Sequence, residues 1–237
     1  MNAFLFGGRM KICSKLNKTE FAIWLLSVVT IAVSFLLVSE KDYLTLTASL
    51  IGATALIFVA KGEVLGQILT VVFSIFYGVI SFKFRYFGEL ITYVGMTATI
   101  ALMSAVTWLK NPYKKGESEV KIAKLTKGKI ILMIVLTAVT TFAFYFILRY
   151  FNTANLFFST VSVATSFSAS YLMLFRSPYY AVAYAANDVV LIILWVLASV
   201  TNIQYVPMVI CFVIFLVNDL FGFISWQKRK KQQRNTV

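Results

Sequence analysis

Residues 179–200 read YYAVAYAANDVVLIILWVLASV, and this stretch predicts a membrane-spanning helix with polar residues at its centre. It is apolar over the roughly 20 residues that an α-helix needs to cross a bilayer, yet Asn187 and Asp188 lie near its middle. A carboxylate at this depth costs about 2.5–3.5 kcal/mol on insertion scales, so it normally faces a polar cavity or a partner inside a helix bundle. The next apolar stretch carries a second pair, Asn218-Asp219. These pairs are the first candidates for a functional site.

The composition is that of an all-α integral membrane protein. Of the 237 residues, 60% are hydrophobic and 13% are charged, whereas soluble domains average about 45–50% and about 25%. The net charge of +13 could suggest nucleic acid, but all 22 Lys and Arg residues lie at the termini or between apolar stretches. That placement is typical of topology signals, so we expect no nucleic-acid partner. The sequence has no His, which removes the commonest general base and metal ligand. We expect neither a catalytic residue nor a metal or other cofactor.

Eight apolar runs of about 17–24 residues follow one another along the chain. Each is long enough for an α-helix to cross about 30 Å of hydrocarbon. The sequence therefore predicts about eight transmembrane helices. The runs are 22–38, 43–60, 64–82, 86–109, 129–150, 155–175, 179–200 and 204–226.

The basic residues predict the orientation of these helices. Counted over alternate connections from the N-terminus, one side of the membrane holds 18 Lys and Arg residues and the other side holds 4. Because basic loops stay in the cytoplasm, both termini and the basic 110–128 loop should be cytoplasmic, in a multi-pass protein of the cell (inner) membrane. We interpret the loop as an orienting linker near anionic lipid, with a regulatory or partner-binding role as the alternative.

The two halves of the chain look related at an offset of 118 residues. Trp108 and Trp226 each end a run before positive charge, and Tyr77 corresponds to Trp195. An even number of crossings separates the two units, so they would be parallel repeats with a substrate site between them. The predicted parts are 1–42 (basic N-terminus and extra helix), 43–109 (first repeat), 110–128 (cytoplasmic loop), 129–151 (linking helix), 155–227 (second repeat) and 228–237 (basic tail).

The polar residues of the second half suggest a ligand. Tyr184, Asp188 and Trp195 fall on roughly one helical face, beside Asn187. Aromatic rings next to a carboxylate suit a planar and polar ligand, either neutral or cationic, because the rings stack and the acid accepts hydroxyl hydrogen bonds or balances charge. The alternative is a structural role, with the acid accepting a hydrogen bond and the rings packing. The pair Asn218-Asp219 could equally join helices together.

The first half offers a smaller set of polar candidates. Gln67 and Tyr77 share one run, and Glu89, Tyr93 and Thr97 follow one face of the next. Glu89 is close to the predicted outer boundary, where an interfacial acid is the alternative. We include Gln67, Tyr77, Glu89 and Tyr93 among the candidate substrate-binding residues.

Several of these residues match a known pattern. They are Tyr180-x-x-x-Tyr184-x-x-Asn187-Asp188, the following Leu194-Trp195, Asn218-Asp219-x-x-Gly222-Phe223-x-x-Trp226, and Tyr86-Phe87-Gly88-Glu89 with a run that ends at Trp108. Over about 43–227 the sequence resembles the PnuC family of vitamin-precursor transporters. The resemblance implies a three-plus-one-plus-three helix bundle similar to that of SWEET sugar transporters. It also implies a homotrimer that takes up nicotinamide riboside by facilitated diffusion, with cytoplasmic phosphorylation trapping the substrate.

The chain departs from this family pattern at two places. The family usually has a tryptophan where this sequence has Ala181, and the N-terminal span is additional. Relatives carry thiamine, riboflavin or deoxynucleosides, and these are the alternative substrates. A proton-coupled carrier that uses Asp188 or Asp219 is the alternative mechanism. A membrane scaffold and a membrane-embedded enzyme are the rival classes, and for the enzyme these two acids would be the only candidate catalysts.

Overall fold

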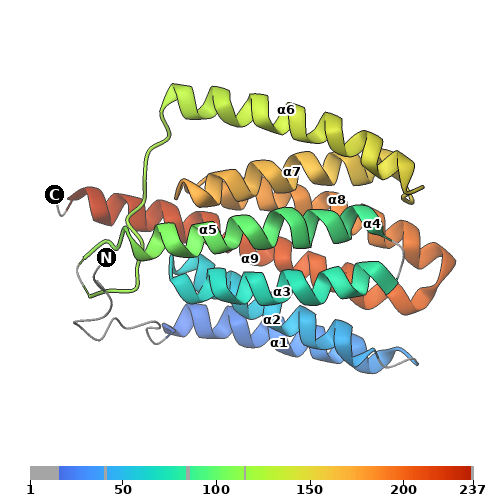
Figure 1. Ribbon diagram of the computed structural model, residues 1–237. Helices are drawn as coiled ribbons and strands as arrows, with labels where there is room; N and C mark the ends of the chain where they lie inside the picture. Colours follow the sequence, from blue (N-terminus) through green and yellow to red (C-terminus); the bar gives the residue numbers. More distant parts are fainter. Residues whose placement is uncertain (1–15, 40–41, 84–85, 115, 236–237) are drawn as a thin grey trace, which may run out of the picture.

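The fold is an all-helical bundle, seen here in a computed structural model that describes residues 16–39, 42–83, 86–114 and 116–235 (Figure 1). Within these ranges, eight helices are long and apolar enough to cross a membrane, as predicted. Several basic residues used in the charge count lie outside the described residues: Arg9, Lys11, Lys15, Lys41, Arg85 and Lys115.

The helices match the predicted runs closely. The fourth span is continuous but contains a π-helical segment, η1, between α4 and α5, and a short 3-10 turn, η2, precedes the last helix. The elements are α1 (Lys18–Leu37), α2 (Tyr43–Ala60), α3 (Val64–Lys83), α4 (Phe87–Leu90), η1 (Ile91–Thr97), α5 (Ala98–Leu109), α6 (Lys127–Tyr150), α7 (Leu156–Leu174), α8 (Tyr180–Thr201), η2 (Ile203–Tyr205) and α9 (Val206–Asn235).

Two helix ends differ from the predicted ones. α1 begins at Lys18 rather than at 22, because Asn17 and Glu20 form a capping box with two reciprocal hydrogen bonds of 2.9 Å. α9 continues through the basic tail to Asn235, although the tail was predicted to be separate from 228 onward. Lys, Arg and Gln form helices well, and cations are favourable near a helix C-terminus. Hydropathy predicts where the membrane-spanning part of a helix ends, and α9 continues beyond that point.

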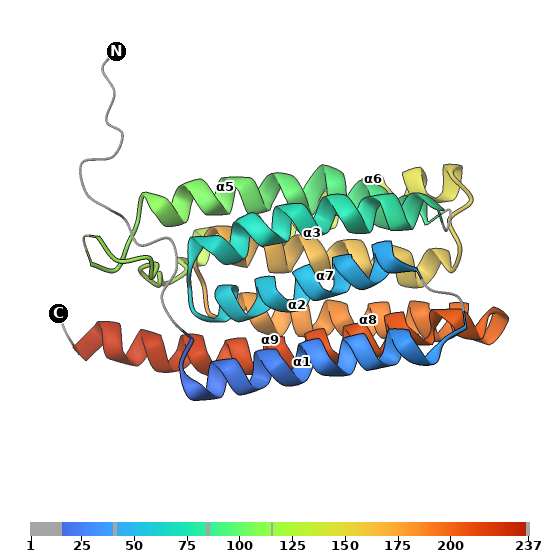
Figure 2. The same cartoon turned by 90° about the horizontal axis from the view of Figure 1, so that it is seen from below.

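The helices lie side by side, and α6 lies on the outside (Figures 1 and 2). α1 packs against α2 and α9, whereas α6 packs mainly against α7. Leu148 is the one buried residue of α6. We call the end of the bundle where α1 begins and α9 ends the terminal end, and the other the opposite end (Figure 1).

The remaining helices make two sets of similar contacts. α2 packs against α3 and against α9, while α7 packs against α8 and against α5. Trp226 of α9 donates to the Val59 carbonyl of α2 at 2.9 Å. Trp108 of α5 donates, more weakly at 3.4 Å, to the Met173 carbonyl of α7. One tryptophan thus holds α9 against α2, and another holds α5 against α7.

The 110–126 segment is bonded to several parts of the terminal end. Val120 N donates to the carbonyl of Gly62 at 2.9 Å, in the α2–α3 turn, where a φ of 72° favours glycine. Ala123 N donates to the Arg176 carbonyl at 3.1 Å, in the α7–α8 turn. Gln233 of α9 accepts from Ile122 N at 2.9 Å. The segment therefore joins both halves of the bundle at this end.

Candidate functional site

A small cavity lies in the middle of the bundle, and we call it the central cavity. Its volume is about 60 Å³, which is room for a few water molecules. Residues of α2, α3, η1, α7, α8 and α9 line it: Gly52, Ala55, Leu56, Val59, Gln67, Thr70, Phe73, Tyr93, Thr97, Met173, Tyr184, Asn187, Asp188, Phe215 and Asp219. Among these described residues two are acids and none is Lys or Arg.

Asn187 is held in one orientation by α7. Its Oδ1 accepts hydrogen bonds from the hydroxyls of Thr165 and Ser166, each at 2.9 Å. Both lone pairs of this oxygen are therefore used, which leaves the side-chain NH₂ as the group that can serve a ligand. Tyr184, one turn earlier on α8, is positioned in a similar way by a 3.1 Å hydrogen bond to Ser170.

The two acids of the cavity interact with each other. Asp188 of α8 and Asp219 of α9 both line it, and their carboxyl groups lie close enough to interact electrostatically. When two buried carboxyl groups share a site, ionisation of one disfavours ionisation of the other. Both residues are buried, with 4% and 3% of their surface exposed. Asp188 Oδ2 and Gln67 Nε2 are buried without a hydrogen-bond partner. Since buried polar atoms are nearly always paired, an unpaired acceptor and an unpaired donor at one cavity point to a polar ligand.

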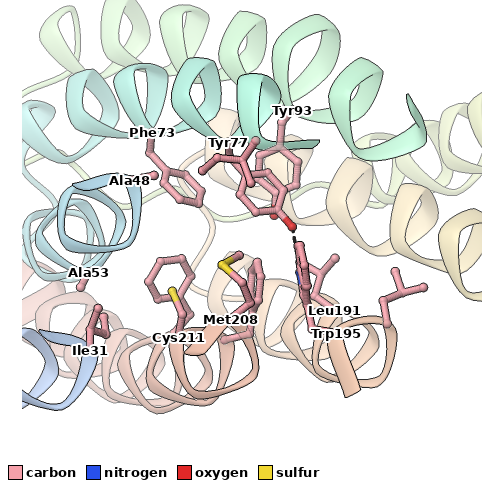
Figure 3. Close-up of a cluster of buried hydrophobic side chains, with 14 of the residues drawn as sticks. Ile31, Ala48, Ala53, Phe73, Tyr77, Tyr93, Leu191, Trp195, Met208 and Cys211 are labelled. Carbon is pink, nitrogen blue, oxygen red and sulfur yellow. Dashed lines mark hydrogen bonds between the residues drawn. The ribbon is translucent and has the colours of Figure 1, made fainter. Parts of the chain in front are cut away.

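An aromatic layer separates the cavity from the opposite end of the bundle. Trp195 Nε1 donates to Tyr77 Oη at 3.1 Å, and the rings of Tyr77 and Tyr93 are 4.3 Å apart (Figure 3). Tyr86 packs edge-on against Trp195 at 5.5 Å.

A second aromatic contact lies on the other side of the cavity, toward the terminal end. The rings of Trp108 and Trp226 are 5.5 Å apart, and Tyr180 packs against Trp226 at 4.8 Å. Trp226 lies two helical turns beyond Asp219 on α9, and Tyr180 one turn before Tyr184 on α8. The cavity thus has an aromatic barrier on each side.

The structure brings six of the ten predicted site residues to the cavity and places the other four elsewhere. The six are Gln67, Tyr93, Tyr184, Asn187, Asp188 and Asp219. Tyr77 and Trp195 lie in the adjoining aromatic layer. Asn218 points to α1, where its Nδ2 donates to Ser27 at 2.9 Å. Glu89 accepts from Ser162 of α7 at 3.1 Å, nearer the opposite end.

Several lining residues were not among the predicted site residues. Thr70 lies one turn from Gln67 on the same face of α3, a spacing that could have identified it. Thr97 shares a face with Tyr93, and both belong to the π-helical segment η1. π-Helical turns often occur at functional sites. Gly52 and Phe215 are apolar lining residues without a signal in the sequence.

Comparison with known proteins identifies the family. The sequence profile of the nicotinamide mononucleotide transporter family matches residues 42–228. A nicotinamide riboside transporter PnuC from Neisseria mucosa is 24% identical over 216 residues, which are 89% of this chain and 82% of that protein.

A solved structure has the same fold. The crystal structure of the vitamin B3 transporter PnuC superposes with a TM-score of 0.81 at 22% identity, covering 94% of this chain and 96% of that chain. These proteins are transporters and not enzymes, and the resemblance to the PnuC family is confirmed. The chain therefore belongs to the nicotinamide mononucleotide transporter family of multi-pass membrane proteins.

Proposed function

We propose that this protein carries nicotinamide riboside across the cell membrane. The central cavity is the observation that carries the proposal. Asp188, Asp219, Tyr93 and Tyr184 line it, and none of the described lining residues is Lys or Arg. Nicotinamide riboside has a cationic pyridinium ring and ribose hydroxyls, which such a cavity complements. The Neisseria mucosa relative is named for transport of this molecule.

The charge of the cavity favours the riboside over the mononucleotide of the family name. The mononucleotide carries a phosphate, with a charge of roughly −1.5 to −2 at neutral pH. Placing that phosphate beside Asp188 and Asp219 would bring like charges together in a buried site, which is strongly unfavourable. The riboside brings one positive charge to the same acids.

The contacts of the substrate follow from the orientation of the lining groups. Asp188 Oδ2 has no partner, so it is placed to accept from a ribose hydroxyl. The NH₂ groups of Asn187 and Gln67 would donate to hydroxyl or carboxamide oxygens. Tyr184 and Tyr93 would pack on the pyridinium ring. Trp195, in the adjoining layer, would act in closing the site rather than in stacking.

Transport by alternating access requires the cavity to widen. Pockets that hold small molecules usually measure about 300–1,000 Å³, whereas the central cavity measures about 60 Å³. We infer that the Tyr77–Trp195 layer separates to admit substrate from one side and the Trp108–Trp226 contact separates to release it on the other. Both contacts join residues 118 apart. Together with the two sets of helix contacts, this supports the proposed three-plus-one-plus-three parallel repeat, with α6 linking the two units.

We propose facilitated diffusion, with cytoplasmic phosphorylation trapping the riboside. A second candidate is a proton-coupled carrier, because Asp188 and Asp219 lie together in the buried cavity and two close carboxyl groups favour the retention of one proton. Vesicles without a kinase separate the two mechanisms. Facilitated diffusion predicts that internal riboside reaches only the external concentration, whereas accumulation that an uncoupler abolishes would establish proton coupling.

The orientation and assembly of the protein are part of the proposal. The split of 18 basic residues to 4 supports a cytoplasmic position for the terminal end, both termini and the 110–126 segment. The family resemblance suggests a homotrimer, for which the outer face of α6 offers a large exposed apolar surface. The mass of the purified protein–detergent complex, corrected for detergent by light scattering, tests the trimer.

Uptake into proteoliposomes tests the substrate. We expect saturable counterflow of radiolabelled nicotinamide riboside, with unlabelled riboside competing and the mononucleotide not competing. Thiamine, riboflavin and a deoxynucleoside serve as the alternative competitors. If one of these exchanges while the riboside does not, the substrate assignment is wrong. If none exchanges, the transport proposal itself fails.

A further inference from the structure

A second concave site lies at the terminal end, between the 110–126 segment and the last two turns of α9. Its volume is about 270 Å³, and we call it the basic pocket. It is far from the central cavity along the bundle, since Gln233 lies 14 residues, or roughly 20 Å of helix, beyond Asp219. The residues that line it are Tyr113, Lys121, Ile122, Ala123, Lys124, Lys230, Gln233 and Arg234.

The walls of the basic pocket are held in place by hydrogen bonds. Gln233 is buried, and its side chain accepts from Ile122 N at 2.9 Å and donates to the Val120 carbonyl at 3.1 Å. Lys121 N donates to the Asn111 carbonyl at 2.9 Å. The bonds of Gln233 fix the α9 wall against the wall formed by the 110–126 segment. The bond of Lys121 holds the second wall in shape. The pocket is therefore a built feature of the fold.

The charges of the basic pocket are not balanced by the acids around it. Lys121, Lys124, Lys230 and Arg234 contribute four positive charges. The nearest acids are engaged elsewhere: Glu119 pairs with Arg229 and accepts from Gln233, and Glu117 pairs with Lys114. Among the ion pairs of the described residues, none includes a cation of the basic pocket. Four like charges around one concavity attract an anion.

The position of the pocket narrows the class of anion. Trp226 bonds to Val59 at the end of α2, and Gln233 lies seven residues, or about 10 Å, further along α9. The apolar span of α2 ends at Ala60, which we take as the edge of the hydrocarbon. The hydrocarbon is about 30 Å thick and the whole bilayer about 40–45 Å, so the headgroup region adds about 5–7.5 Å on each side. The pocket is therefore expected at or just beyond the level of the lipid phosphates. Lys and Arg bind phosphate through short, charge-assisted hydrogen bonds.

We propose that the basic pocket binds a phosphate-bearing anion, either a soluble phosphate monoester or the headgroup of an anionic lipid. Because its two walls include the segment that joins Gly62 to Arg176, an occupant holds both halves of the bundle together at this end. The proposal is independent of which molecule the central cavity carries. It assigns a role to the 110–126 segment beyond orienting the protein in the membrane.

Two double variants of equal charge test the proposal. Lys230→Gln with Arg234→Gln removes two cations of the pocket, whereas Lys228→Gln with Lys231→Gln removes two cations of the same helix outside it. The probe is adenosine 5′-monophosphate, with adenosine as the phosphate-free control. Binding is measured by calorimetry at constant ionic strength, with the full chain in phosphatidylcholine nanodiscs. A lipid arm adds phosphatidylglycerol to the nanodiscs and identifies co-purified lipid by mass spectrometry.

The expected result is that the monophosphate binds and adenosine does not. Binding should weaken about 100-fold in the pocket variant, from the loss of two charged hydrogen bonds, and stay within about twofold in the control variant. If phosphatidylglycerol instead co-purifies with the wild-type and control proteins, competes with the monophosphate, and is lost from the pocket variant, the occupant is a lipid headgroup. The proposal is overturned if the two double variants behave alike in both arms, or if neither phosphate compound binds.

Discussion

Replacing the two acids of the central cavity, singly and together, tests how the site holds a cation. Because two close carboxyl groups in a buried site do not readily ionise together, we expect Asp188 and Asp219 to share one proton and to carry a net charge of −1 as a pair. In Asp188→Asn, the new amide can donate to Asp219 through its NH₂ group, which keeps that charge, and the amide oxygen takes the place of Oδ2 as an acceptor. The single variant should therefore weaken binding by no more than the loss of one neutral hydrogen bond would, about 0.5–1.5 kcal/mol or roughly 2- to 10-fold in affinity.

The double variant, Asp188→Asn with Asp219→Asn, loses the charge itself. Two unit charges roughly 5 Å apart interact by about 3 kcal/mol at an effective dielectric constant of about 20. That corresponds to roughly 150-fold in affinity, about 15 times the largest effect expected for Asp188→Asn alone. Titration calorimetry of nicotinamide riboside with the purified variants measures these ratios.

Glu89→Gln is the matched control, because Glu89 is a buried acid outside the central cavity. We expect its affinity for the riboside to equal that of the wild type. The reasoning is refuted if Asp188→Asn alone weakens binding as much as the double variant does, since Asp188 alone would then carry the charge that holds the substrate. Equal affinity in all variants would remove the acids from the binding site altogether.

Three further predictions concern stability and orientation. Asn218→Ala should lower the melting temperature through loss of its hydrogen bond to α1, worth about 0.5–1.5 kcal/mol, and leave riboside affinity unchanged; a loss of affinity would place Asn218 in the site. Tyr77→Phe should destabilise the fold by about 1–3 kcal/mol, because Trp195 Nε1 loses its acceptor in a buried layer; an unchanged melting temperature would contradict this. In intact cells, an impermeant maleimide should label a cysteine introduced at Asn152 but not one at Lys114, and the reverse pattern would invert the proposed topology.

The helices could be predicted from the sequence because the bilayer imposes a length and a hydropathy on each span. The π-helical segment in the fourth span and the hydrogen bonds of the 110–126 segment could not. The bond from Val120 to Gly62 joins residues that are far apart in the sequence and lie in irregular structure. No periodic pattern in the sequence marks such a contact, so the basic and turn-rich sequence of this loop predicts only a linker.

The cavity residues that are unusually polar for an apolar helix could be predicted from the sequence. The residues whose orientation depends on packing between helices could not. Asn187 and Asp188 stand out in an apolar helix, and both line the cavity. Asn218 and Asp219 stand out equally, but consecutive helical residues point about 100° apart, and the packing of α1 decides which one faces the cavity. Trp195 shares the face of Asp188, as predicted, but lies about 10 Å further along the axis, beyond the reach of a small cavity.

The hydrogen bond between Tyr77 and Trp195 has a consequence for how such a protein could arise. In a symmetric dimer of half-length chains, a residue on the two-fold axis meets its own copy. Two tryptophans could not bond to each other there, because the indole N–H only donates. Once two copies are joined in one chain, the paired positions can diverge into a donor and an acceptor. If the halves are repeats, the donor Trp195 and the acceptor Tyr77 became different residues after the two copies were joined in one chain.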